Sequence, residues 1–296
     1  MQPLLERLQG GEILFCDGAL GTLLQARGLQ VGECPELWSV DKPDDVQSIH
    51  QDYKDAGSDI VECNSFGGSR YKLSHYGLQD RVSEINRAAA SVARKVAGND
   101  QHVLGSMGPT GAFLEPLGDE TPEAFTQAFA EQAIALQEGG ADCVIIETMT
   151  AIEEATCAVK AAKENTTLTV VASFTFDPQI HGGYATMMGV TPSRFAEAMF
   201  EAGADILGSN CGTGPDHMVE IVRLIRETIS EVPTMAMPNA GMPVIENGET
   251  VFKETPDEMA NKACKLVDAG ASIIGGCCGT TPAHIAAMRK AILGKH

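Results

Sequence analysis

Three cysteines have the residue type and the neighbours of a metal site. Cys211 follows an apolar run in Asn210-Cys-Gly212, and Cys277 and Cys278 follow another in Gly275-Gly-Cys-Cys-Gly279. Adjacent cysteines on a regular strand would face opposite ways, but the glycines at 275, 276 and 279 free the backbone to turn both thiols inward. The alternative is three buried, inert cysteines. Two adjacent cysteines among glycines, with a third at the end of another apolar run, favour the metal site.

A three-cysteine set predicts a particular chemistry. Three thiolates leave one tetrahedral position of Zn²⁺ open, which is typical of a catalytic rather than a structural zinc. A substrate thiol, with a free pKa of about 8.5, would lose its proton on entering that position. Hydrolytic zinc sites more often use histidine and carboxylate ligands, and none of the seven histidines falls at a predicted strand end. The residues therefore favour alkylation of a substrate sulfur over activation of water.

Two carboxylates, Asp17 and Glu147, also follow short apolar runs. They could form a general acid/base pair, or they could bind a substrate ammonium group through charge-assisted hydrogen bonds. Asp17 could instead form a turn with Gly18, and Glu147 could bind a neighbouring loop. The backbone N–H groups of Gly18 and Ala19 could bind a carboxylate. Together these groups would suit an amino acid that carries a thiol.

A repeated pattern predicts how these residues are positioned. Four segments (55–64, 138–147, 201–210 and 268–277) each contain a helix end, a glycine cap and a short buried strand, and the spacing leaves room for one more unit between each pair. Short apolar runs at 12–17, 102–107, 168–174 and 233–238 supply those strands. Thr-Pro pairs at Thr121, Thr191, Thr255 and Thr281 fit helix starts, and Thr255 with Glu258 fits a capping box. The predicted helices span 44–56, 81–96, 123–138, 152–163, 193–201, 216–230, 257–269 and 283–293.

Eight strands that alternate with eight helices predict an α/β chain folded as a single (β/α)₈ TIM barrel over residues 1–296. All the candidate residues then lie at the carboxyl ends of strands, where barrel active sites are found. The alternative is an open doubly wound sheet, which usually carries a glycine-rich phosphate loop that is not found here.

Composition excludes several other functions. The 296 residues include 21 Lys and Arg against 40 Asp and Glu, so a formal charge of −19 makes nucleic acid or anionic lipid a poor partner. No run of 18 apolar residues predicts a membrane span, and residues 1–11 do not resemble a signal peptide. Nine cysteines in a chain of this length do not suggest a disulfide framework. We therefore expect a cytoplasmic protein without a nucleic-acid or membrane partner.

The motifs resemble those of the zinc-dependent homocysteine S-methyltransferases. Asp17-Gly-Ala-Leu-Gly-Thr22, Cys63-Asn-Ser-Phe66, Glu147-Thr148, Asn210-Cys211 and Gly275-Gly-Cys-Cys-Gly-Thr280 follow in the order of that family. Pro238-Asn-Ala-Gly241 and the segment 244–249 are most similar to the homocysteine-binding domain of cobalamin-dependent methionine synthase. The resemblance covers nearly the whole chain.

This resemblance implies a barrel in which Cys211, Cys277 and Cys278 hold zinc. It implies that homocysteine places its amino group on Asp17 and Glu147 and its carboxylate on the backbone of Gly18 and Ala19. Asn239 would occupy or guard the open metal position when substrate is absent. A methyl group would pass in line to the substrate thiolate and give methionine, with no general base required.

The methyl donor is a separate question. The chain ends after the last predicted barrel helix, so we expect methylcobalamin to act indirectly, through a corrinoid protein or module outside this chain. Alternatives are a donor of the S-methylmethionine or betaine type, another acceptor thiol, or a non-catalytic subunit that binds homocysteine and zinc in a corrinoid complex. The tract 187–192 could contact the donor or pack in the core. Asp100-Gln-His-Val-Leu-Gly105 matches a cobalamin motif but leads into a strand at the opposite rim, which indicates a chance match.

Overall fold

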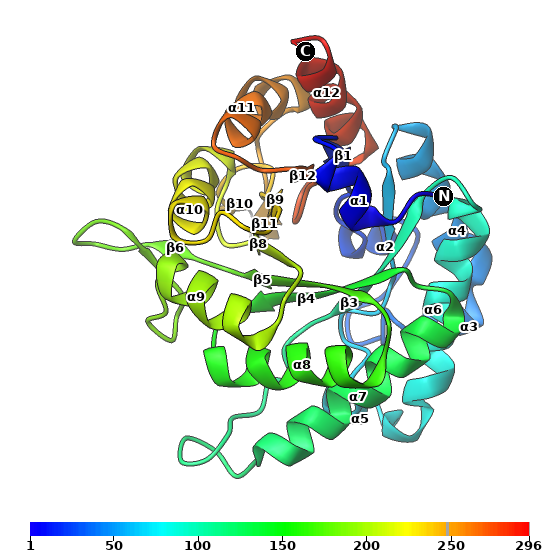
Figure 1. The fold of residues 1–296 in the computed structure, drawn as a ribbon. Coiled ribbons are helices and arrows are strands. Elements are labelled where there is room, and N and C mark those ends of the chain that lie inside the picture. The colour runs from blue at the N-terminus through cyan, green and yellow to red at the C-terminus, as the bar shows by residue number, and fades with distance from the viewer. Residues whose placement is uncertain (247–248, 296) are drawn as a thin grey trace.

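The computed structural model describes residues 1–246 and 249–295 and confirms the predicted barrel (Figure 1). Eight parallel strands form one sheet in the order β1-β12-β9-β8-β5-β4-β3-β2. A parallel bridge between Cys16 and Ile60 joins the first strand to the second and closes the ring. The strands are β1 Leu14–Phe15, β2 Ile60–Glu62, β3 His102–Met107, β4 Cys143–Met149, β5 Thr169–Phe174, β8 Ile206–Asn210, β9 Thr234–Met237 and β12 Ile273–Ile274.

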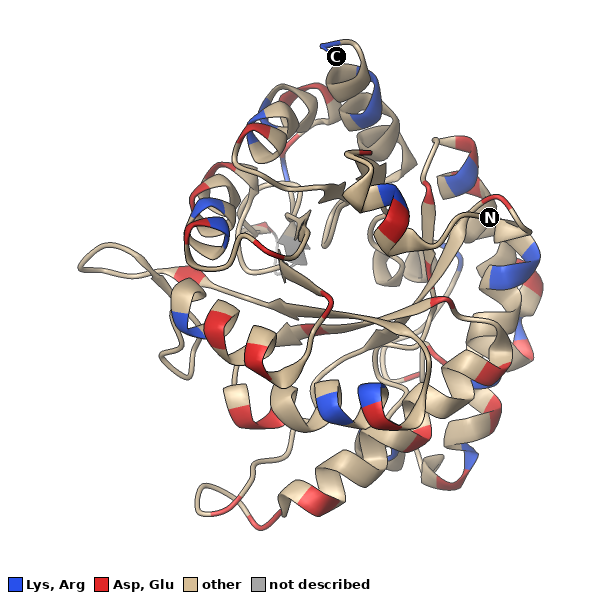
Figure 2. Ribbon diagram, in the orientation of Figure 1, with Lys and Arg blue, Asp and Glu red and all other residues tan. Residues whose placement is uncertain are grey.

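An outer ring of helices follows the strands. Charged residues gather mostly on these helices, while the strands are largely free of charge (Figure 2). The ring consists of α4 Pro43–Asp55, α6 Val82–Ala97, α7 Pro122–Gly139, α8 Ile152–Asn165, α9 Pro192–Ala202, α10 Pro215–Thr228, α11 Pro256–Asp268 and α12 Pro282–Leu293.

The helix starts follow from the Thr-Pro pairs. The hydroxyls of Thr121, Thr191 and Thr255 each accept a hydrogen bond from the backbone N–H three residues on, and proline occupies the first turn. In turn, the Glu258 carboxylate accepts a hydrogen bond from the Thr255 N–H at 2.8 Å, which confirms the predicted capping box.

The barrel interior is apolar at the end where the strands begin, the amino-terminal end. Leu14, Ile60, Ile145 and Val171 belong to one buried cluster inside the sheet. The helix α1 Leu4–Gln9, which the sequence analysis does not predict, adds Leu4 and Leu8 to that cluster and closes the amino-terminal end of the barrel. The open end of the barrel is therefore the carboxyl-terminal rim, where the candidate residues lie.

Several short elements occupy the loops after the strands. They are α2 Gly21–Ala26, α3 Trp38–Asp41, α5 Arg70–Ser74, the 3₁₀ turn Gln79–Arg81, and the hairpins β6 Asp177–Pro178 with β7 Tyr184–Ala185 and β10 Val244–Glu246 with β11 Glu249–Val251. The described part of the chain contains no helix that is both long and apolar enough to cross a membrane.

Candidate active site

The structure brings the three predicted cysteines together. The sulfurs of Cys211, Cys277 and Cys278 all lie within 4.8 Å of one another, and those of Cys211 and Cys278 are 3.8 Å apart. Two sulfurs held about 2.3 Å from one tetrahedral zinc ion would be about 3.8 Å apart, so the spacing and the soft donor set fit that ion. Thiol hydrogen bonds from Cys277 and Cys278 lower the pKa of Cys211 to about 3. The two neighbouring thiols therefore favour the thiolate form of Cys211, which is the form that binds a metal ion.

The backbone explains why the thiols converge. Cys211 has a φ of +59°, a conformation rare for residues other than glycine, and it turns the chain at the end of β8. Its N–H donates to Met237 O at 3.2 Å, and the N–H of Cys277 donates to Pro238 O at 2.9 Å. Both ligand segments are thus fixed to the end of β9, which lies between β8 and β12.

The glycines around the cysteine pair act in two ways. Gly279 has a φ of +79°, so it provides the turn that the sequence predicts. Gly276 is needed for space, because a Cβ there would lie 2.4 Å from the Thr280 hydroxyl. That hydroxyl donates to Cys277 O at 2.7 Å and accepts the N–H of Ala19 at 3.1 Å. Thr280 therefore joins the cysteine loop to the loop that follows β1.

A cavity of about 410 Å³ opens over the thiol trio. The same cavity is lined by Gly18, Ala19, Glu62 and Glu147. Of the predicted carboxylate-binding groups, the Ala19 N–H already donates to Thr280. A substrate carboxylate would have to displace that bond in order to use it.

The two predicted carboxylates occupy different positions. Glu147 lines the cavity, accepts hydrogen bonds from the Ser106 hydroxyl and, at 2.9 Å, from the Asn210 amide, and has a pKa raised by burial. Asp17 is fully buried and does not line the cavity. It accepts the backbone N–H of Glu62 at 2.8 Å, and burial raises its pKa to about 7.

Glu62 is the site residue that the sequence analysis missed. It lines the cavity from the end of β2, and a carboxylate oxygen lies within 4.8 Å of one of Asp17. Burial, followed by the charges of Glu147 and Asp17, raises its pKa. The position of Glu62 at a strand end, like that of Glu147 at the end of β4, is the signal that could have identified it.

Asn239 lies beside the trio. It is 3% exposed, and its side chain forms a hydrogen bond with Cys211 that helps to lower the pKa of the thiol. Its Oδ1 atom is buried and has no hydrogen-bond partner among the described residues. A buried acceptor without a donor is costly, and it is the kind of atom that a cation would satisfy.

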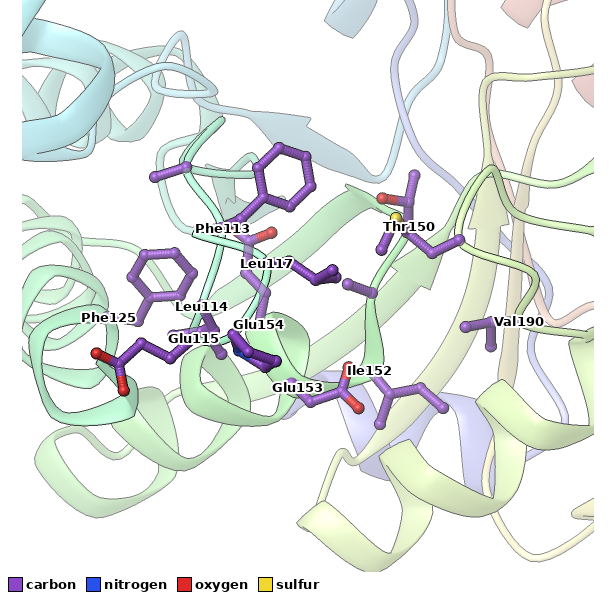
Figure 3. Close-up of a pocket in the computed structure, with 14 residues that line it drawn as sticks. Phe113, Leu114, Glu115, Leu117, Phe125, Thr150, Ile152, Glu153, Glu154 and Val190 are labelled. Atoms are coloured by element: carbon purple, nitrogen blue, oxygen red, sulfur yellow. The ribbon is translucent and has the colours of Figure 1, made fainter. Parts of the chain in front are cut away.

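A second pocket, of about 370 Å³, lies between the loop after β3 and the start of α8 (Figure 3). Its lining is largely apolar and includes Phe113, Leu117 and Ile152, together with Met188 and Val190 from the predicted donor-contact tract. His102, from the cobalamin-like motif, is 2% exposed at the start of β3, which agrees with a chance match.

Comparison with known proteins agrees with this geometry. The profile of the family described as Homocysteine S-methyltransferase matches residues 14–292. Methionine synthase from Mycobacterium tuberculosis (strain ATCC 25618 / H37Rv) is 33% identical over 298 residues, covering 95% of this chain and 24% of that protein. Methionine synthase from Mycobacterium leprae (strain TN) is 32% identical, covering 98% and 25%. The chain spans about a quarter of the length of these relatives.

Solved structures show the same fold. The metallated form of the homocysteine methyltransferase MmuM from Escherichia coli is 25% identical with a TM-score of 0.77, covering 97% of this chain and 99% of that one. A methyltransferase from Methanosarcina mazei shares the fold, with a TM-score of 0.63 at 13% identity and coverage of 99% and 97%.

The fold and the site thus define a (β/α)₈ barrel enzyme with a candidate three-thiol metal centre at its carboxyl-terminal rim. The chain belongs to the homocysteine S-methyltransferase family, which confirms the family and the class of enzyme predicted from its motifs.

Proposed function

We propose that this chain methylates the sulfur of homocysteine at a zinc centre formed by Cys211, Cys277 and Cys278, and so produces methionine. The observation that carries the proposal is the single cavity that holds both the thiol trio and the carboxyls of Glu62 and Glu147. A ligand that fits this cavity would carry a thiol at one end and an ammonium group at the other. Homocysteine is an amino acid of this type.

Zinc, when bound, supplies the Lewis acidity that removes the proton from the substrate thiol. The residues of the chain position the substrate. The cysteines fix where the sulfur sits, and the carboxyls hold the ammonium so that the sulfur faces the open rim. The new S–CH₃ bond forms as the donor–CH₃ bond breaks, and the bonding electron pair leaves with the donor. No side chain needs to act as a general base, because the proton has left before methyl transfer.

The buried Oδ1 of Asn239 supports a further role in this scheme. We propose that this atom would be the fourth ligand of a bound metal in the absence of substrate, and that a substrate sulfur would replace it. The absence of a hydrogen-bond donor for this atom among the described residues is the observation behind the proposal. Asp17 accepts the backbone N–H of Glu62 behind the cavity, and we propose it as a second contact for the substrate amino group.

The proposed donor is a methyl-corrinoid carried by a separate protein or module. The similar methionine synthase is about four times as long as the region that it shares with this chain. That extra length supports a donor carried by another module or protein. The alternative is a small onium compound such as S-methylmethionine or a betaine. It is favoured by the Escherichia coli homocysteine methyltransferase, because the match covers 99% of that chain.

The test is a methylation assay on zinc-loaded protein with homocysteine and each donor in turn: methylcobalamin, S-methylmethionine and betaine. We expect methionine from methylcobalamin. Turnover only with an onium donor would discard the corrinoid proposal. Zinc and homocysteine binding without transfer from any donor would instead favour a binding subunit.

A further inference from the structure

The segment 252–254, which follows the hairpin after β9, crosses the loops of the proposed metal ligands. The Glu254 N–H donates to Ala240 O at 3.1 Å, and the Ala240 N–H donates to Cys278 O at 3.0 Å. Ala240 comes directly after Asn239, the proposed fourth ligand. The segment is therefore bonded to the cysteine loop through the residue that follows Asn239.

Two further contacts hold this segment in place. Phe252 packs directly on the cysteine loop, because a Cβ at Gly279 would collide with it. The Lys262 ammonium pairs with the Glu254 carboxylate at 2.5 Å and with Asp216, in the first turn of α10, also at 2.5 Å. Since α10 begins after the loop at the end of β8, the segment is connected to every loop that carries a proposed ligand.

His284, in the first turn of α12, joins this segment to the far end of the cysteine loop. The Thr281 N–H donates to His284 Nδ1 at 3.1 Å, and His284 Nε2 lies 2.9 Å from Glu254 O. A backbone N–H can only donate and a carbonyl can only accept, so Nδ1 carries no proton and Nε2 carries one. The ring is 6% exposed and is held as the neutral Nε2–H tautomer. Its two nitrogens therefore have separate roles, because Nδ1 caps α12 and Nε2 binds the segment 252–254.

We infer that His284 is a positioning residue for the metal centre, and that it acts through the hydrogen bond from Nε2 to Glu254 O. This bond closes a ring of contacts whose members are, in order, Cys278, Ala240, Glu254, His284 and Thr281. Without it, one end of the segment would be released, and the Ala240 bond that fixes the cysteine loop would weaken. The inference rests on the proposed function, because it concerns how firmly the chain retains the proposed zinc.

Glutamine and glutamate at this position separate the two roles of the ring. Either side chain can accept the N–H of the N-cap residue from the third helical position, as in a capping box, but only glutamine also has an N–H to donate. His284→Gln therefore keeps both bonds, whereas His284→Glu keeps the cap and loses the bond to Glu254 O. An added negative charge would by itself attract Zn²⁺, so faster zinc release from His284→Glu would result from the lost bond.

The test measures the rate at which zinc-loaded protein without homocysteine loses zinc to a coloured chelator. We expect His284→Glu to release zinc about tenfold faster than the unaltered chain, and His284→Gln to stay within about threefold of it. Thr121→Ala is the control, because it removes the cap of α7. It should lower the free energy of unfolding by about 1 kcal/mol without changing zinc release.

The outcomes separate this inference from the proposed function. Equal release rates from His284→Gln and His284→Glu would overturn the inference, because the ring would then act only as a helix cap. Faster release from Thr121→Ala would also overturn it, since general destabilisation would explain the effect. If His284→Glu does not fold, His284→Leu takes its place, and release as slow as from the unaltered chain would reject the inference. Failure of the unaltered chain to bind zinc would instead overturn the proposed function.

Discussion

The sulfurs of Cys211 and Cys278 lie 3.8 Å apart although 67 positions separate the two residues in the chain. With Cys277 they form the proposed ligand set, in which each member would contribute one sulfur to a metal ion. We expect Cys277→Ala to lower zinc affinity at least tenfold, since the loss of a direct ligand should exceed that of a supporting residue. Metal analysis after dialysis measures this. Cys157→Ala, at a buried cysteine of α8, is the control, and full zinc content in Cys277→Ala would contradict the assigned ligand set.

The Thr280 hydroxyl links the cysteine loop to the loop after β1 through Cys277 O and the Ala19 N–H. Thr280→Val keeps the shape but leaves buried polar groups unpaired. We expect it to reduce the free energy of unfolding by about 1–3 kcal/mol, and Thr280→Ser to reduce it by less. Urea unfolding of both variants measures the difference. Equal stability of the two would show that the hydroxyl does not hold the loops together.

Asn239→Ala tests the fourth metal position. Without homocysteine, we expect the variant to lose zinc to a chelator about tenfold faster than the unaltered chain, because no side chain would fill the open position. With saturating homocysteine the two rates should agree, since the substrate sulfur replaces the amide. A stopped-flow measurement with a coloured chelator provides both rates. Equal rates in the absence of homocysteine would exclude this role for Asn239.

Burial raises the pKa of Asp17 to about 7 from an ordinary value near 4. Between about pH 4 and 7 the folded chain therefore keeps a proton that the unfolded chain has lost, so stability falls as the pH rises through this window. Asp17→Asn removes this titration. Over the same pH range, the decrease in the free energy of unfolding should be smaller by at least about 1.4 kcal/mol, the equivalent of one pKa unit.

Urea unfolding of metal-free protein at several pH values measures the effect of Asp17→Asn. The exposed substitution Asp100→Asn serves as its control. A fall in stability as large in Asp17→Asn as in the unaltered chain would show that Asp17 is ionised in the folded state.

Much of the barrel is predictable because its signals are local. A glycine cap, an apolar strand and a Thr-Pro start recur along the chain, and helices such as α7 and α11 begin within a residue or two of the predicted positions. The short elements α1, α2 and α3 have four to six residues each, too few to show a helical period.

The site was predictable in part for the same reason. The cysteines are identified by their type and by their places at strand ends. Glu62 has the same kind of position but was overlooked. The hydrogen bonds that distinguish its carboxyl from that of Glu147 come from Ser106 and Asn210, on two other strands. The hydrogen-bond partners of each carboxyl therefore depend on how strands far apart in the sequence align, and no local pattern shows that alignment.

The ligand segments follow β8 and β12, and β9 lies between these strands. Cys277 and Cys278 belong to the last βα unit of the barrel, so a growing chain that ends before Cys277 contains only one of the three thiols. During synthesis, capture of the proposed metal by all three thiols would therefore wait until this final unit docks between β9 and β1. A bound ion would then stabilise only the assembled barrel, and its uptake would indicate that the last strand has taken its place.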